Sequence, residues 1–221
     1  MIKSQPNPMR LRILLISAML FSLNAFAQEW KPLFTAQSID GWEATPSGRT
    51  PYKLIDGMLT SQTDSKGMLR YAKESFGDCV LRLVYRMSNE TGNAGVFIRI
   101  PTANATENQA INQGIEVQID ERDDEWHSTG TLYSMTRAKA RPYLPAGEWN
   151  TMEITLDGLR TVVMLNGVLV TDYDGVSEVP AKRKSYEPNR GPRPARGYIG
   201  LQNHDSRATI TFKEISVRPL K

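Results

Sequence analysis

Short stretches in which apolar and polar residues alternate make up most of the chain after residue 27. A period of two sends successive side chains to opposite faces of a strand. The dipeptides Asp56-Gly57, Asp157-Gly158 and Asn166-Gly167 separate such stretches and suit tight hairpin turns. The pattern predicts strands at 52–55, 58–60, 80–87, 95–100, 115–120, 130–133, 150–157, 161–165, 168–173, 197–202 and 209–217.

No stretch of twelve or more residues keeps a helical period between capping residues. Many short strands without helical crossovers favour an all-β, two-sheet antiparallel jelly-roll sandwich. A closed barrel is less favoured, because most of the strands carry one apolar and one mixed face. Neither an internal repeat nor a domain boundary is visible, so residues 28–221 are expected to form one domain.

The first 27 residues have the pattern of a signal peptide. Lys3, Arg10 and Arg12 precede an apolar stretch at 13–26, and Ala25-Phe26-Ala27 supplies the small-residue cleavage pattern. The apolar run is too short and too interrupted for a membrane span, which needs about 20 apolar residues. We therefore expect cleavage after Ala27, a periplasmic or secreted protein, and no membrane span after cleavage.

Charge and cysteine content exclude several function classes. The chain has 27 Lys and Arg against 24 Asp and Glu, but the three basic residues of the leader account for the excess. A neutral mature chain gives no reason to expect nucleic-acid binding. Cys79 is the only cysteine, so an internal disulfide is impossible, and its apolar neighbours indicate a buried thiol rather than a nucleophile.

The segment 114–120 carries the most chemical information. Its apolar residues share one face of a strand, whereas Glu116, Gln118 and Asp120 share the other. Like charges at neighbouring positions on one face are unfavourable unless something uses them. A ligand-binding or catalytic groove is one use, and a solvated sheet face is the alternative.

Two further strands repeat this arrangement. Phe97 and Arg99 lie opposite an aliphatic face, as do Gln202 and His204. A groove on the concave side of one sheet would hold polar groups that suit a carbohydrate: Arg99, Glu116, Gln118, Asp120, Tyr133, Gln202 and His204. The alternatives are an ion pair for Arg99, a sheet-edge histidine for His204, and core packing for Tyr133 and Trp149.

Two loops could modify such a site. The acidic loop at 121–128 could offer oxygen ligands to Ca²⁺, but it lacks the EF-hand spacing, so we expect a solvated loop and assign no metal ligands. The segment at 179–196 is rich in Pro, Arg and Lys, and is either a lid over the site or a long surface connection.

Eight short motifs occur in order along almost the whole mature chain, from about residue 32 to 220. They are Ile39-Asp40-Gly41-Trp42, Asp56-Gly57-Met58-Leu59, Asn93-Ala94-Gly95-Val96-Phe97-Ile98-Arg99, Glu116-Val117-Gln118-Ile119-Asp120, Thr129-Gly130-Thr131-Leu132-Tyr133, Gly147-Glu148-Trp149-Asn150, Leu165-Asn166-Gly167 and Gly197-Tyr198-Ile199-Gly200-Leu201-Gln202-Asn203-His204. The ordered series resembles the 3-keto-disaccharide hydrolase family. Ala94 departs from the family pattern, which usually has Ser there.

The resemblance implies a concanavalin A-like jelly roll, of the lectin and glucanase type, that acts on glycosides oxidised at C3 by a partner sugar 3-dehydrogenase. The ketone acidifies the C2 proton, so a base can remove it and the C1 aglycone can leave by elimination, after which water adds. The hypothesis makes His204 or Glu116 the base, Asp120 its partner or the acid, and Arg99 the oxyanion stabiliser. The expected substrate-binding residues are Asn93, Gln118, Tyr133, Trp149, Asn150 and Gln202. The chemistry requires no cofactor and leaves Ca²⁺ or another divalent ion open.

Two other functions fit the same residues. A conventional glycosidase would use Glu116 and Asp120 as a carboxylate pair, about 5–5.5 Å apart for retention or about 6.5–9.5 Å apart for inversion. A non-catalytic carbohydrate-binding domain would use the polar groups only to hold hydroxyls, because a fold does not fix a function.

Overall fold

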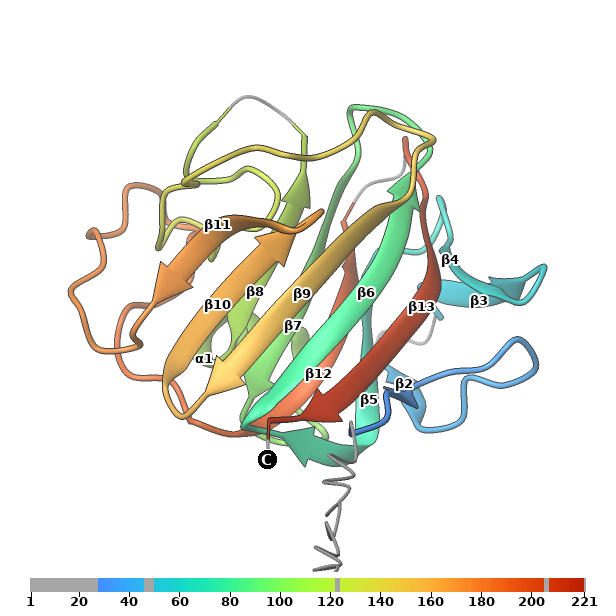
Figure 1. Cartoon of the computed structure of the whole chain (residues 1–221), viewed down its shortest axis with the longest axis horizontal. Coiled ribbons are helices and arrows are strands. Elements are labelled where there is room, and N and C mark those ends of the chain that lie inside the picture. Colours follow the sequence, from blue (N-terminus) through green and yellow to red (C-terminus); the bar gives the residue numbers. More distant parts are fainter. Residues whose placement is uncertain (1–27, 46–49, 122–123, 205–206, 221) are drawn as a thin grey trace, which may run out of the picture.

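The computed structural model describes residues 28–45, 50–121, 124–204 and 207–220, and the expected signal peptide lies outside them. Two antiparallel sheets pack face to face (Figure 1). The larger sheet has the order β11-β10-β9-β6-β13-β4-β3, and β1 pairs with β13. Its strands are β1 (Lys31–Pro32), β3 (Tyr52–Ile55), β4 (Met58–Ser61), β6 (Cys79–Met87), β9 (Asn150–Asp157), β10 (Arg160–Leu165), β11 (Val168–Tyr173) and β13 (Ile210–Pro219).

The smaller sheet has the order β2-β5-β12-β7-β8 and carries the polar faces described above. Its strands are β2 (Trp42–Ala44), β5 (Gly67–Phe76), β12 (Gly197–Asn203), β7 (Asn93–Ile100) and β8 (Ile115–Asp120). The all-β, two-sheet sandwich is confirmed. Among the described residues, no helix is long and apolar enough to cross a membrane.

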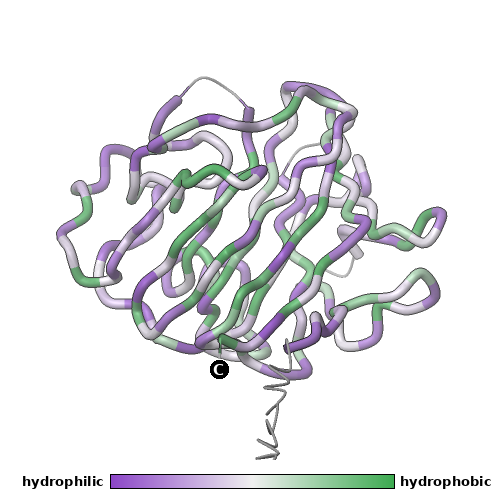
Figure 2. Tube along the Cα trace, viewed as in Figure 1, coloured by the Kyte–Doolittle hydropathy of each residue, from purple (hydrophilic) through white to green (hydrophobic). Residues whose placement is uncertain are grey.

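The core lies between the sheets and follows the expected alternation. Leu83 and Tyr85 of β6 face Val96 of β7 and Val117 of β8 in one buried cluster. Figure 2 shows apolar and polar residues alternating along the strands of the larger sheet. Cys79 belongs to this cluster as a free thiol, and burial raises its pKa to about 11. The expectation of a buried structural thiol is confirmed.

Hairpin turns lie where the dipeptides predict them. Asp56 and Gly57 both have positive φ, as do Asn166 and Gly167, which is the type I′ geometry that joins twisted strands. The strand predicted at 130–133 is wrong: Leu132 forms only an isolated bridge with Val117, and the surrounding residues form turns. The ten-residue strand β5 was not predicted, because Gly67–Phe76 lacks a clear period of two.

One helix, α1 (Glu107–Gln113), was not predicted either. Thr106 and Gln109 form a capping box that starts it, but Ala110 is its only buried residue. A single small buried side chain gives no hydrophobic period, so the capping signal alone marked this helix. Ala110 packs with Met68 and Phe97 in a second apolar cluster, which places α1 on the outer face of the smaller sheet.

Candidate functional site

Strand register brings the predicted polar residues together on the outer face of the smaller sheet. Glu116 pairs with Phe97, Gln118 with Gly95, and Asp120 with Asn93. On the other side of β7, Gln202 of β12 also pairs with Gly95. The polar residues of these pairs line two adjoining cavities of about 450 and 530 Å³ that share Asn93, Tyr133 and Tyr186. We call the joined space the groove.

A chain of side-chain contacts crosses the groove floor. The Gln118 amide donates to Asn93 Oδ1 at 3.2 Å, and Asn93 Nδ2 lies 3.4 Å from His204 Nδ1. Gln118 is 1% exposed, and its Oε1 has no hydrogen-bond partner among the described residues. A buried acceptor without a partner is costly, so this atom offers a position for a ligand hydroxyl.

Glu116 is the most strongly perturbed group of the floor. Burial raises the pKa of its carboxyl to about 8, and the nearby charges of Asp120 and Glu107 act in the same direction. A carboxyl that titrates near neutral pH in a ligand-sized groove is suited to accept a proton. Glu116 is therefore the strongest candidate for a general base.

Gly95 makes room for this carboxyl. A Cβ atom at position 95 would lie 2.3 Å from Glu116 Oε1 and 2.8 Å from its Cγ. The Glu116 side chain thus rests directly on the backbone of β7, which only glycine permits.

Replacing Gly95 with Ala therefore tests the position of Glu116. Because the clash involves only side-chain atoms of Glu116 and no backbone atom, the side chain can move aside, and we expect a melting temperature close to that of the wild type. A misplacement of about 1 Å can cost about 100-fold in rate, and we expect a loss of that order in sugar turnover. The double variant Gly95→Ala/Glu116→Asp shortens the acid and should recover part of the activity. Wild-type turnover by Gly95→Ala would contradict this role.

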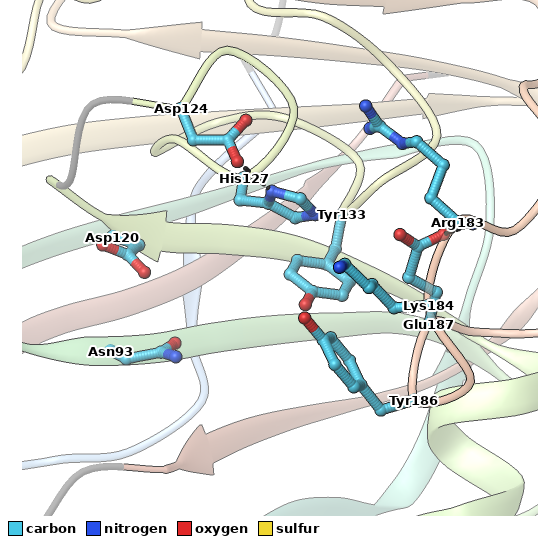
Figure 3. A pocket seen from close by; sticks show the side chains of 9 residues that line it. All are labelled: Asn93, Asp120, Asp124, His127, Tyr133, Arg183, Lys184, Tyr186 and Glu187. Atoms are coloured by element: carbon cyan, nitrogen blue, oxygen red, sulfur yellow. Dashed lines mark hydrogen bonds and ion pairs between the residues drawn. The ribbon is translucent and has the colours of Figure 1, made fainter.

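A histidine–carboxylate pair that sequence reasoning did not select lies on the loop after β8. His127 Nδ1 is 2.6 Å from Asp124 Oδ2, and the Trp126 amide donates to Asp124 Oδ1 at 2.9 Å. The His127 ring packs against Tyr133, with 4.7 Å between ring centroids. Figure 3 shows all three side chains at the groove. The only signal in the sequence was the run of acidic residues in the loop at 121–128, which predicts a solvated loop.

The structure separates Arg99 from the groove and corrects its assignment as the oxyanion stabiliser. Its φ of +57° and a bulge in the β7–β12 pairing interrupt the alternation that predicted its face. Its guanidinium donates to Pro194 O at 3.0 Å, Ala195 O at 2.5 Å and Arg160 O at 3.0 Å. Arg99 is 1% exposed and ties loops together at one end of the sandwich.

Trp149 and Asn150 are also absent from the groove lining, so the structure does not support their expected role in substrate binding. Trp149 lies between the cations of Arg86 and Lys213, on the face of the larger sheet that points away from the core. Asn150 is buried, and its Oδ1 accepts from the Leu144 amide at 2.8 Å, so it holds a turn. The other predicted residues line the groove: Asn93, Glu116, Gln118, Asp120, Tyr133, Gln202 and His204. The described residues contain no cluster of three or more metal-ligating side chains.

Almost the whole described chain matches one known protein family. The family model of the 3-keto-alpha-glucoside-1,2-lyase-like domain matches residues 29–218 of the sequence. The chain belongs to this family. The family and the jelly-roll fold together indicate a carbohydrate-active domain, and the family's match spans every groove residue named above.

Several solved structures have the same fold as this chain and match it over most of their own length. One, from Parabacteroides distasonis ATCC 8503 and provisionally described as a glycosyl hydrolase, is 25% identical with a TM-score of 0.69, over 87% of this chain and all of that one. A second from the same organism, with the same description, is 16% identical with a TM-score of 0.71, over 87% and 94%. The carbohydrate-binding module CBM66 of Bacillus subtilis is 16% identical with a TM-score of 0.53, over 80% and 95%. No curated protein matches the chain.

Proposed function

We propose that this protein cleaves the C1 glycosidic bond of 3-keto-glycosides, with Glu116 as the base that removes the C2 proton. The observation that carries the proposal is a carboxyl that packs on Gly95 in the floor of a groove of sugar-binding groups, where burial raises its pKa to about 8. Such a base is partly ionised at neutral pH and yet basic enough to attack a C–H bond next to a ketone.

The electrons of the C2–H bond would form an enolate that includes the C3 oxygen. As the enolate collapses, a double bond forms between C1 and C2, and the aglycone oxygen takes up the proton that Glu116 removed from C2. The Asp120 carboxylate supports the base, because its charge raises the pKa of Glu116. Water added across this double bond would give the free 3-keto sugar. Gln202 lines the same cavity as Glu116, and its amide is a candidate donor to the enolate oxygen in place of Arg99.

A substrate deuterated at C2 tests this chemistry directly. We expect release of the aglycone from a 3-keto-α-glucoside, with a primary isotope effect because the C2–H bond breaks. We also expect Asp120→Asn and His204→Ala to slow the release, and Lys182→Met, a substitution outside the groove lining, to leave it unchanged. A conventional glycosidase would cleave the unoxidised glucoside and show no primary effect at C2. Full activity of both groove variants would reject their assignment.

A binding module is the second candidate, favoured by the buried Gln118 acceptor and the amide-rich floor, which are equally suited to holding hydroxyls. Calorimetric binding of a 3-keto or native glucoside without turnover of either would support it. Turnover of the 3-keto substrate alone would reject it. If the 3-keto substrate is turned over, the proposal includes a partner dehydrogenase that oxidises the glycoside at C3 beforehand.

A further inference from the structure

The basic segment at 179–196 forms a fixed wall of the groove. Arg190 lies at its centre and donates to Glu187 at 2.9 Å, to Pro180 O at 2.7 Å and to Ser134 O at 3.2 Å. Glu187 is 2% exposed, so this ion pair is largely withdrawn from water. A buried pair gains little stability over apolar packing, but it fixes geometry, and here it fixes a surface segment against the loop that carries Tyr133.

The far end of the wall is attached to α1 and to the glycine that caps its C-terminus. Arg193 Nε donates to Gly114 O at 2.6 Å, and the Asn189 amide donates to Asn112 Oδ1 at 3.1 Å. The wall is therefore anchored at both ends of the stretch that faces the groove, and it is not a free lid.

Five residues of the wall line the groove, and three of them are exposed: Arg183, Lys184 and Tyr186. Figure 3 shows Lys184 and Tyr186 extending from the wall toward the side on which Tyr133 lies. The Arg183 guanidinium packs over the Trp126 ring, 4.8 Å from its centroid. Tyr186 is 68% exposed, which leaves most of its ring available for stacking.

The positive charge of Lys184 has no partner in the part of the chain that the structure describes. Among the described residues its ammonium makes no hydrogen bond or ion pair, whereas the neighbouring carboxylates have partners. Asp124 is bonded to His127, and Glu187 to Arg190. An exposed cation on an anchored segment, lining the same cavity as an exposed aromatic ring and with the nearby Asp124 and Glu187 already paired, is suited to a ring that carries a negative charge.

We infer that the aglycone of the preferred substrate is a ring bearing a carboxylate, stacked on Tyr186 and paired with Lys184. This inference rests on the proposed function for the sugar half of the groove, which lies at Glu116, Gln118 and Gln202. Tyr133 and Asn93, shared by both cavities, mark the boundary between the sugar and the aglycone.

The test compares two aglycones of nearly equal shape. The 4-(carboxymethyl)phenyl and 4-(carbamoylmethyl)phenyl 3-keto-α-glucosides differ in charge at a group that a methylene separates from the ring and its leaving oxygen. We expect the wild type to prefer the carboxylate about three- to fivefold in kcat/KM, as a solvated ion pair provides. The preference should disappear in Lys184→Met, reverse in Lys184→Glu and fall with rising salt. Lys182→Met, from the same segment but outside the groove lining, should keep the wild-type ratio. Tyr186→Ala should slow both substrates alike.

The outcomes separate this inference from the function. Turnover of both substrates with equal efficiency, or a preference that survives in Lys184→Met, overturns the anionic aglycone and leaves keto-glycoside cleavage standing. If neither substrate is turned over, the proposed function fails. Calorimetry with the two unoxidised glucosides then decides the inference: a carboxylate preference that depends on Lys184 supports it, and equal binding overturns it.

Discussion

Glu116→Gln is expected to reduce turnover of a 3-keto-glucoside by about 100- to 10,000-fold, the usual contribution of a general base. The amide has nearly the same shape as the carboxyl and keeps the position over Gly95, but it cannot accept the proton. Rates of aglycone release under saturating substrate measure the loss in kcat. Retention of more than a tenth of the wild-type rate would remove Glu116 from the mechanism.

The pH profile provides a second measurement on the same carboxyl. Because a base acts only when deprotonated, kcat/KM should rise with pH and reach half of its plateau near pH 8, the pKa of Glu116 in the folded protein. Asp120→Asn is the control for this pH profile. Removing a neighbouring negative charge should lower the pKa of Glu116 and move the midpoint to lower pH. A midpoint near the ordinary glutamate value of 4.5 would contradict the burial argument.

The same raised pKa has a cost in stability. Between about pH 4.5 and 8 the unfolded chain has an ionised Glu116 and the folded protein a protonated one, so the folded state binds more protons. Stability contributed at this site therefore falls as pH rises through that range. We expect Glu116→Gln to melt at a higher temperature than the wild type at pH 8, and the difference to shrink toward pH 5. A group placed for chemistry rather than stability behaves in this way.

Arg99→Ala is expected to produce the largest loss of stability, about 3–5 kcal/mol, because it empties the space of a large buried side chain and removes its hydrogen bonds to three backbone carbonyls. For a chain of this size that corresponds to a fall in melting temperature of roughly 10 °C. Thermal unfolding measures it. Arg99→Lys should recover part of the loss, since one ammonium can still reach some of these oxygens.

Kinetics on the folded fraction decide between the two roles considered for Arg99. If it only joins loops, kcat measured well below the melting temperature should stay within about threefold of the wild type. A loss of kcat without a loss of stability would return Arg99 to the reaction.

The period of two was sufficient to predict most strands and the residues of the groove floor, because β8 keeps strict alternation and a single pairing register. It failed at Arg99, where a left-handed residue in a bulge changes the direction of the side chain and no residue type in the sequence marks it. The resemblance to a family was stronger evidence for the fold than any single strand.

The groove wall could not be predicted from the sequence, because its position depends on contacts between distant residues. Arg190 reaches Ser134, and Asn189 reaches Asn112. His127 was missed for the same reason: its value as a site residue comes from Asp124 and Tyr133 beside it, and a lone histidine in an acidic loop gives no such signal.

Cys79 offers a built-in reporter on all of these variants. Its thiol is 4% exposed at the start of β6, a central strand of the larger sheet, and its pKa of about 11 leaves little thiolate at neutral pH. A thiol reagent can therefore react only when this part of the sandwich opens. The rate of labelling at the single cysteine gives the opening free energy of the native protein, without an introduced probe, and would distinguish variants that loosen the sandwich from variants that change only the groove.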